Sequence, residues 1–327
     1  MKFDYIIGNP PYQVSDGGAG ASATPVYQDF FDEAKKLNPR AIDLITPSKW
    51  FAGGKGLDSF RAEMLNDHHL VKIVDFVNAK DCFPNASIGG GVNYFLWSRL
   101  NKSDTCAFTN IHDGKKSTVD RDLSEFPVLV RYNESVNIIH KVLKGNPSLV
   151  SETVDSRNSF GLPSSFRGNK AKESDDDCLV YSSGGRGYVS FNSITKGEEL
   201  IDKYKVIISR ITSEHAGEPD KNGKFAVVST VKVLQPGEVC TDSYLVAYAS
   251  LSKDKAENFA SYVCTKFFRF LLLQAISSIN LSKDKFQFVP IVDLNQRWTD
   301  EMLYYHFGLS EDESKFINNM MKKKEMA

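Results

Sequence analysis

Short apolar runs alternate with amphipathic stretches along the first hundred residues. Runs of apolar, β-branched and aromatic residues, which are typical of buried strands, cover residues 3–8, 41–45, 70–76 and 92–97. Between them, residues 27–37 and 57–65 carry apolar side chains at helical spacing. Because strands that alternate with helices form βαβ units, we predict a parallel sheet that the run at 92–97 closes with a hairpin.

The pattern changes after residue 100, where residues 101–120 are polar and charged. We predict an amphipathic linking helix at 128–143 and a loop or boundary at 151–177. Further β-rich runs cover residues 204–210, 225–234 and 243–249, and helices are predicted at 255–276, 298–307 and 310–322. The chain therefore divides into an α/β domain over residues 1–145 and an α+β domain over residues 146–327.

A stiff polar turn follows the first predicted strand at Asn9, Pro10, Pro11 and Tyr12. The two prolines fix φ and remove two backbone donors, so the chain leaves the strand extended, with carbonyls pointing outward. In an open α/β sheet, ligands gather beyond the carboxyl ends of the strands. The Asn9 amide oxygen and the Pro10 carbonyl can accept both hydrogens of an exocyclic amine, and Tyr12 offers a flat face to the ring that carries it. A base flipped out of a duplex needs both features, whereas the alternative is a proline-rich loop with no ligand.

Composition excludes several classes of protein. The 327 residues are 41% hydrophobic and 25% charged, which argues against a disordered or fibrous chain. Forty Lys and Arg against 41 Asp and Glu give a net charge of -1, so any polyanion must be met by a local basic face. The five cysteines include no Cys-x-x-Cys pair and indicate free thiols in a reducing compartment, here the cytoplasm. We expect no metal site, no signal peptide and no membrane span.

Several motifs together resemble one enzyme family. They cover residues 3–13, 45–51, 53–57 with 60–61, 83–84 to 89–92, 288–290, 298–300 and 304–310. These segments resemble the S-adenosylmethionine-dependent DNA adenine N6-methyltransferases of restriction-modification systems, especially the long methylases with an Asn-Pro-Pro-Tyr motif. The resemblance covers most of the chain, strongly before residue 100 and loosely after it.

The resemblance implies a fold and a set of site residues. The first domain would be the second half of a methyltransferase (Rossmann-like) sheet, followed by an α+β target-recognition domain. Asn9, Pro10 and Tyr12 would be catalytic, with Asn9 and Pro10 also next to the methyl donor, S-adenosylmethionine. Tyr12 and Phe95 would stack on the flipped base, although ordinary core packing is the alternative for Phe95.

The resemblance also implies double-stranded DNA as the partner. Lys49 and Arg61 are expected to contact phosphates near the catalytic turn. Base reading falls to side chains on loops of the second domain, with Arg186, Arg210, Lys221 and Lys224 as candidates. For each of these the alternative is a solvated surface charge.

The donor-binding motifs of the family have no counterpart here. In the family an earlier strand and a glycine-containing turn precede the catalytic motif, whereas Met1 lies two residues before the first predicted strand. The glycine-rich stretches at 17–20, 53–56 and 89–91 do not open a first βα unit. We therefore expect a partner chain or a missing N-terminal segment to complete the sheet, and no activity without it.

Other functions stay open beside site-specific DNA adenine methylation. The chain could be a non-catalytic DNA-binding subunit or a truncated remnant of such a methylase. Protein-glutamine methyltransferases share Asn-Pro-Pro-Tyr but end soon after the sheet closes, so the second domain argues against them. A nuclease is disfavoured because Glu33-Ala34-Lys35 has no preceding Pro-Asp pair.

Overall fold

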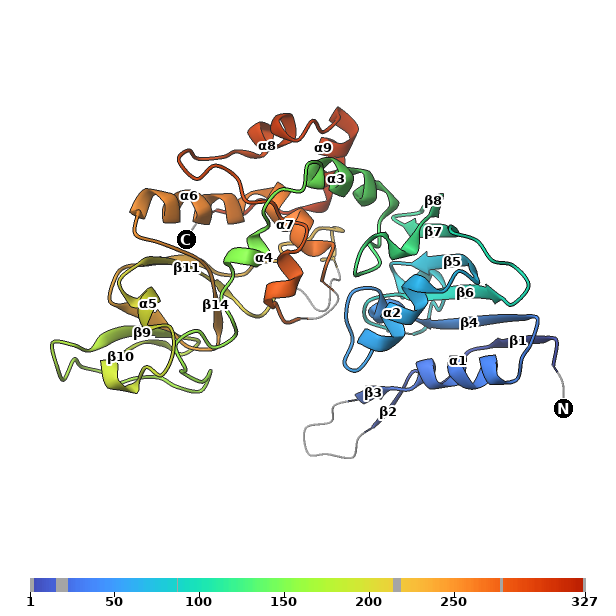
Figure 1. Ribbon diagram of the computed structural model, residues 1–327, viewed down its shortest axis with the longest axis horizontal. Helices are drawn as coiled ribbons and strands as arrows, with labels where there is room; N and C mark the ends of the chain where they lie inside the picture. The colour runs from blue at the N-terminus through green and yellow to red at the C-terminus, as the bar shows by residue number, and fades with distance from the viewer. Residues whose placement is uncertain (1–2, 16–22, 87, 214–218, 277–278, 326–327) are drawn as a thin grey trace. The chain divides into compact units, whose positions relative to one another are not determined.

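The computed structural model describes residues 3–15, 23–86, 88–213, 219–276 and 279–325 (Figure 1). The glycine-rich stretch 17–20 lies outside the described residues. The chain forms two compact units, the first from residues up to Asn137 and the second mainly from Ile138 onward. This division falls inside helix α3 (Asn133–Leu143), whereas the sequence placed the boundary just after that helix.

A six-stranded mixed sheet forms the first unit. Its strands in spatial order are β1 (Tyr5–Gly8), β4 (Ala41–Pro47), β6 (Val92–Ser98), β5 (Leu70–Phe76), β7 (Cys106–His112) and β8 (Lys115–Arg121). β1 pairs in parallel with β4, and β5 pairs in parallel with β7. β6 runs antiparallel between β4 and β5, so the predicted hairpin is present and lies inside the sheet. The fold is therefore mixed α/β, with a sheet that contains parallel pairs.

The sheet extends beyond the predicted strands. Residues 101–120 are polar and charged, and no strand was predicted there. They supply β7 and most of β8. β8 is an edge strand in which most side chains are exposed, so it needs no apolar run to be stable. A short hairpin of β2 (Gln13–Ser15) and β3 (Ala23–Pro25) forms a separate two-stranded sheet.

Two helices cover one face of the six-stranded sheet (Figure 1). α1 (Tyr27–Lys36) buries Tyr27 and Phe31, and α2 (Asp58–Asn66) buries Phe60 and Met64. Phe31 meets the Phe60 ring edge-on, with centroids 6.2 Å apart. Such aromatic pairs contribute about 0.5–1.5 kcal/mol beyond their buried area. This packing fixes the sheet whose carboxyl end holds the candidate site.

The second unit contains two three-stranded sheets. One has the order β10 (Gly185–Val189), β9 (Cys178–Ser182), β13 (Glu238–Cys240), and the other β12 (Val231–Leu234), β11 (Tyr204–Ser209), β14 (Tyr244–Ser250). Its helices are α4 (Val150–Thr153), α5 (Glu198–Ile201), α6 (Lys253–Cys264), α7 (Lys266–Leu273), α8 (Asp300–His306) and α9 (Glu311–Met320). Short 3-10 helices also occur along the chain at Ser48–Phe51, Ala79–Asp81, Leu123–Glu125, Phe191–Ser193 and Lys283–Phe286.

The single helix predicted at 255–276 is in fact two helices. Thr265 ends α6 in an extended conformation and caps α7, because its side chain accepts a hydrogen bond from the Phe268 amide at 3.1 Å. A β-branched residue with a hydroxyl favours this capping role over a helix interior. Arg269, one turn later, is fully buried and donates to backbone carbonyls of Thr265 and Ala226.

Candidate functional site

The Asn-Pro-Pro-Tyr turn lies at the carboxyl end of β1. Gly8, the last residue of β1, is level with Leu44 of β4, and β4 continues to Pro47, so the turn begins near the carboxyl end of β4. Pro10 is buried, whereas Asn9 is exposed and makes no hydrogen bond within the described part of the chain. The Val26 amide donates to the Tyr12 carbonyl at 3.3 Å and fixes the far end of the turn beside α1. The turn is thus held by the fold and leaves the Asn9 amide available to a ligand.

Tyr12 is half-buried beside this turn. Its hydroxyl is buried without a hydrogen-bond partner among the described residues. Burial raises the pKa of Tyr12, and the nearby Cys82 raises it further, so the phenol is neutral at physiological pH. Cys82 follows the 3-10 helix Ala79–Asp81 after β5, which brings that loop close to Tyr12.

Phe95 does not lie at this site, which corrects the predicted base-stacking role. Its ring is fully buried and meets the Phe31 ring edge-on, with centroids 5.1 Å apart. Because successive side chains on a strand face opposite sides of a sheet, Tyr94 points to the other face and is only half-buried. Burial raises the pKa of Tyr94, and the charges of Asp43 and Cys82 raise it further.

Phe83, another half-buried aromatic residue, follows Cys82 in the loop after β5. Its amide donates to the Ala79 carbonyl at 2.7 Å, so the 3-10 helix fixes its position. Sequence reasoning missed both Phe83 and Tyr94. The signal for Phe83 was its place among the motif residues, and the signal for Tyr94 was the two-residue alternation along its strand.

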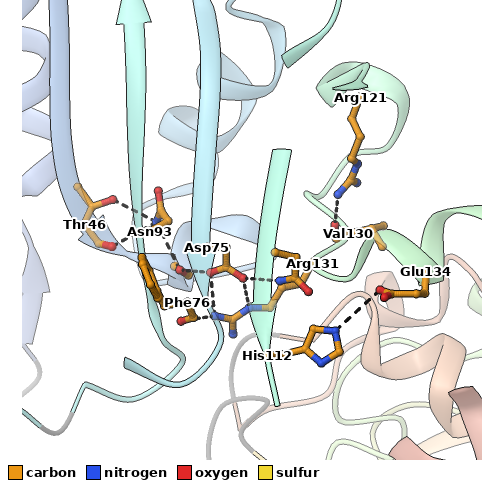
Figure 2. Close-up of polar contacts among 11 residues, drawn as sticks. Thr46, Asp75, Phe76, Asn93, His112, Arg121, Val130, Arg131 and Glu134 are labelled. Carbon is orange, nitrogen blue, oxygen red and sulfur yellow. Dashed lines mark hydrogen bonds and ion pairs between the residues drawn. The ribbon is translucent and has the colours of Figure 1, made fainter. Parts of the chain in front are cut away.

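A buried carboxylate organises the same end of the sheet (Figure 2). Asp75, near the end of β5, is fully buried, and its two oxygens accept hydrogen bonds from Arg131 at 2.7 and 2.9 Å. Ser48 donates to the same carboxylate at 2.7 Å and Asn110 at 3.0 Å. A bidentate arginine pair with two further donors satisfies a charge that would otherwise be costly to bury.

The network continues across neighbouring strands. Asn93 lies opposite both Thr46 and Asp75, and its amide donates to the Thr46 carbonyl at 3.2 Å. Gly91 has φ of 80°, and a Cβ there would lie 2.2 Å from the Arg131 guanidinium. Only glycine therefore fits at this position. The carboxyl ends of β4 and β5 are thereby tied together, and β4 pairs with β1, the strand that precedes the Asn-Pro-Pro-Tyr turn.

The two cations predicted near the turn differ in their surroundings. Lys49 is exposed in the 3-10 helix Ser48–Phe51. Arg61 donates to the Gly53 carbonyl at 3.1 Å and pairs with Asp58, and its side chain is largely buried. These contacts make Arg61 an anchor for the loop at 50–53, while a phosphate contact by Arg61 stays a prediction.

The cations predicted in the second unit also differ. Arg210 pairs with the buried Asp242 at 2.6 Å, and Arg157 pairs with the same carboxylate at 2.9 Å. Although burial opposes it, these two arginines hold the pKa of Asp242 below its ordinary value. Arg210 would have to leave this pair to read a base, whereas Arg186 is exposed on β10.

One family model and one curated relative match the sequence of this chain. Residues 1–83 match the family model described as Eco57I restriction-modification methylase. An "Uncharacterized adenine-specific methylase" from Mycoplasma pneumoniae is 34% identical over 145 residues, which are 43% of this chain and 34% of that relative. The matched region therefore spans about a third of the relative's own length.

Solved structures with partial likeness also come from restriction-modification enzymes. The type IIG restriction endonuclease BpuSI is 11% identical, with a TM-score of 0.37 over 96% of this chain and 49% of that chain. The type IIL enzyme MmeI, solved in complex with DNA, is 9% identical, with a TM-score of 0.38 over 85% of this chain and 45% of that chain. A type I methyltransferase subunit from Streptococcus thermophilus is 13% identical, with a TM-score of 0.26 over 38% of this chain and 31% of that chain.

None of the helices among the described residues is long and apolar enough to cross a membrane. Within the same residues, no group of three or more His, Cys, Asp or Glu side chains is placed to hold a metal ion.

Proposed function

We propose that this chain performs site-specific methylation of adenine N6 in duplex DNA. The chain is a homologue of an adenine-specific methylase, and its residues 1–83 match a restriction-modification methylase model. The observation that carries the proposal is the Asn-Pro-Pro-Tyr turn at the carboxyl end of β1. There the exposed Asn9 amide, the buried Pro10 and the half-buried Tyr12 ring follow one another in one rigid turn.

The turn supports transfer of a methyl group to an exocyclic amine. The Asn9 oxygen and the Pro10 carbonyl accept the two N6 hydrogens and leave the nitrogen lone pair aimed at an electrophile. Tyr12 stacks on the flipped adenine and replaces the stacking lost from the duplex. No general base is needed, because the nitrogen becomes positively charged on attack and then loses its proton to water or a carbonyl.

The residues of the turn fit the methyl-bearing end of S-adenosylmethionine. Asn9 and Pro10 directly follow β1, one of the two edge strands of the sheet as described. When bound, S-adenosylmethionine supplies an electrophilic methyl group. The contacts to its ribose and adenine are proposed to come from protein that pairs with the open edge of β1.

Exposed apolar side chains on β1 support this completion of the sheet. Tyr5 is 65% exposed and Ile7 is 82% exposed, and both belong to a strand with one neighbour among the described residues. An unpaired edge with apolar side chains favours pairing with another segment. We propose that a partner chain or a further segment of polypeptide supplies the adjacent strand and the donor-binding site.

Purification from the native host tests the proposed function. We expect the tagged chain to recover a second polypeptide or a longer form of itself, and the recovered material to transfer a labelled methyl group from S-adenosylmethionine to adenine in duplex DNA. Recovered material that binds DNA but transfers no methyl group would instead favour a non-catalytic DNA-binding subunit or a remnant.

A further inference from the structure

A pair of cations lies over one aromatic ring in the second unit. The Arg186 guanidinium, on β10, is 5.0 Å from the centroid of the Tyr181 ring on β9, where the two residues are directly paired. The Lys232 ammonium, on β12, is 4.8 Å from the same centroid. Tyr181 is buried, and its hydroxyl donates to Glu238 at 3.3 Å, so the ring is a fixed platform. Two like charges from different sheets are therefore held beside one ring.

A third cation lies against the turn of the same hairpin. A Cβ at Gly184 would lie 2.6 Å from the Arg167 Nε, and a Cβ at Gly187 would lie 2.2 Å from the Arg167 carbonyl. Glycine at both positions thus allows Arg167 to pack on the hairpin backbone. The Arg167 guanidinium also donates to the Ser164 carbonyl at 2.7 Å, which holds it in place.

Within the described residues these three cations have no carboxylate partner in an ion pair. Glu238, the acid in contact with Tyr181, is already engaged, because it also accepts a hydrogen bond from the Gln235 amide at 2.8 Å. Like charges held close together repel, so a bound anion stabilises the arrangement. Since the chain as a whole has a net charge of -1, a local basic surface of this kind is where a polyanion can bind.

We propose that Arg167, Tyr181, Arg186 and Lys232 form a surface, the Tyr181 surface, that contacts the phosphate backbone of duplex DNA. The inference rests on the proposed function, which makes DNA the substrate. It changes the role of Arg186 from base reading to phosphate contact, because stacking on Tyr181 fixes its position independently of any base. Phosphate contacts set the register of a protein on DNA and do not depend on sequence.

Fluorescence anisotropy with the full chain tests the Tyr181 surface. The probe is a labelled random-sequence DNA duplex, titrated at several salt concentrations. We expect Arg186→Ala and Lys232→Ala each to weaken binding about 3- to 10-fold, and to lower the slope of log affinity against log salt by about one. Arg186→Lys keeps the charge and should retain most of the affinity. Lys196→Ala removes an exposed lysine of the same unit outside this surface and should have no effect.

Several outcomes would overturn the inference. Unchanged affinity and salt slope in both alanine variants, with thermal unfolding like that of the wild type, would show that the surface does not contact DNA. Wild-type protein that does not bind the duplex, or that binds polyglutamate as tightly, would contradict duplex DNA as the partner. A loss seen with a duplex that carries the methylated sequence but not with the random-sequence duplex would indicate base reading instead. Methyl transfer by the chain together with its partner tests the proposed function separately. If the Tyr181 surface binds DNA but no methyl group is transferred, only the proposed function is contradicted.

Discussion

At the scale of single residues, the proposed stacking role of Tyr12 depends on its ring and not on its hydroxyl. The hydroxyl has no hydrogen-bond partner among the described residues, and Tyr12 is the half-buried last residue of the Asn-Pro-Pro-Tyr turn. We therefore expect Tyr12→Phe to keep near-wild-type affinity for the flipped base. Tyr12→Ala should weaken base capture by about 1–3 kcal/mol, the usual contribution of one stacked base. Binding of a duplex with a mismatched target adenine measures the difference, and equal losses in both variants would contradict a stacking role.

Residue by residue, the sequence predicted the turn better than it predicted its surroundings. Asn9, Pro10 and Tyr12 lie within one stretch of four residues, so their proximity follows from the chain itself. Phe95 was misplaced because a motif does not tell which face of a strand a side chain occupies. The Asp75 and Arg131 pair had no local signal, since the two residues are 56 positions apart and meet only when the sheet is formed.

At the scale of secondary-structure elements, the Asp75 network should stabilise the end of the sheet. Asp75→Asn leaves the Arg131 guanidinium next to a neutral group in a buried site, which should lower the free energy of unfolding by about 3 kcal/mol. Asp104→Asn is a matched control, because the Asp104 side chain is 97% exposed and its loss should change stability by less than about 0.5 kcal/mol. Urea unfolding compares the two, and equal midpoints would show that the network contributes nothing.

The end of β7 and the start of α3 form a second, pH-dependent contact. His112 and Glu134 lie 3.9 Å apart (Figure 2). Contact with Glu134 raises the pKa of His112, and contact with His112 lowers the pKa of Glu134. The contribution of His112 to folding stability is therefore complete at pH values below the ordinary pKa of histidine. It is lost as pH rises through the raised pKa of His112. The contribution of the Glu134 carboxylate to folding stability is present at pH values above the ordinary pKa of glutamate. It is lost as pH falls through the lowered pKa of Glu134.

Stability measurements across pH test this contact. The urea midpoint of the wild type should fall when pH is raised from about 6 to about 8.5, and His112→Gln should lose part of that dependence. His68→Gln, an exposed histidine of the same unit, serves as the control. An unchanged pH profile in His112→Gln would show that the pair is energetically silent.

Element boundaries show why sequence patterns succeed and fail. The strands at 41–47, 70–76 and 92–98 have apolar faces that periodicity detects, and the structure confirms them. β8 was missed because an edge strand with exposed side chains has no such face. The break at Thr265 was missed because the second half of α6 and most of α7 are apolar, so hydrophobic spacing continues through the cap.

At the scale of the whole molecule, the open edge of β1 predicts association. Ile7 is 82% exposed, so Ile7→Asp should change the stability of the chain by itself by less than about 0.5 kcal/mol. The same change should abolish capture of the protein that pairs with β1. Val119→Asp on β8, the opposite edge strand, alters a side chain that is 45% exposed and should leave capture intact. Sedimentation of the complexes compares them, and undiminished association of Ile7→Asp would show that β1 is not the docking edge.

The position of Asn9 in the turn makes one measurement decisive for the whole account. Wild-type chain and Asn9→Ala should each be expressed in the native host in place of the natural copy, and N6-methyladenine mapped across the genome. The account predicts methylation at one short sequence in the wild type. In Asn9→Ala it predicts that the activation barrier rises by about 2–4 kcal/mol and that the mark is almost completely lost. The Asn9 side chain is exposed, so this change should leave the fold unchanged. Full methylation by Asn9→Ala would contradict the assignment of the turn as the catalytic site.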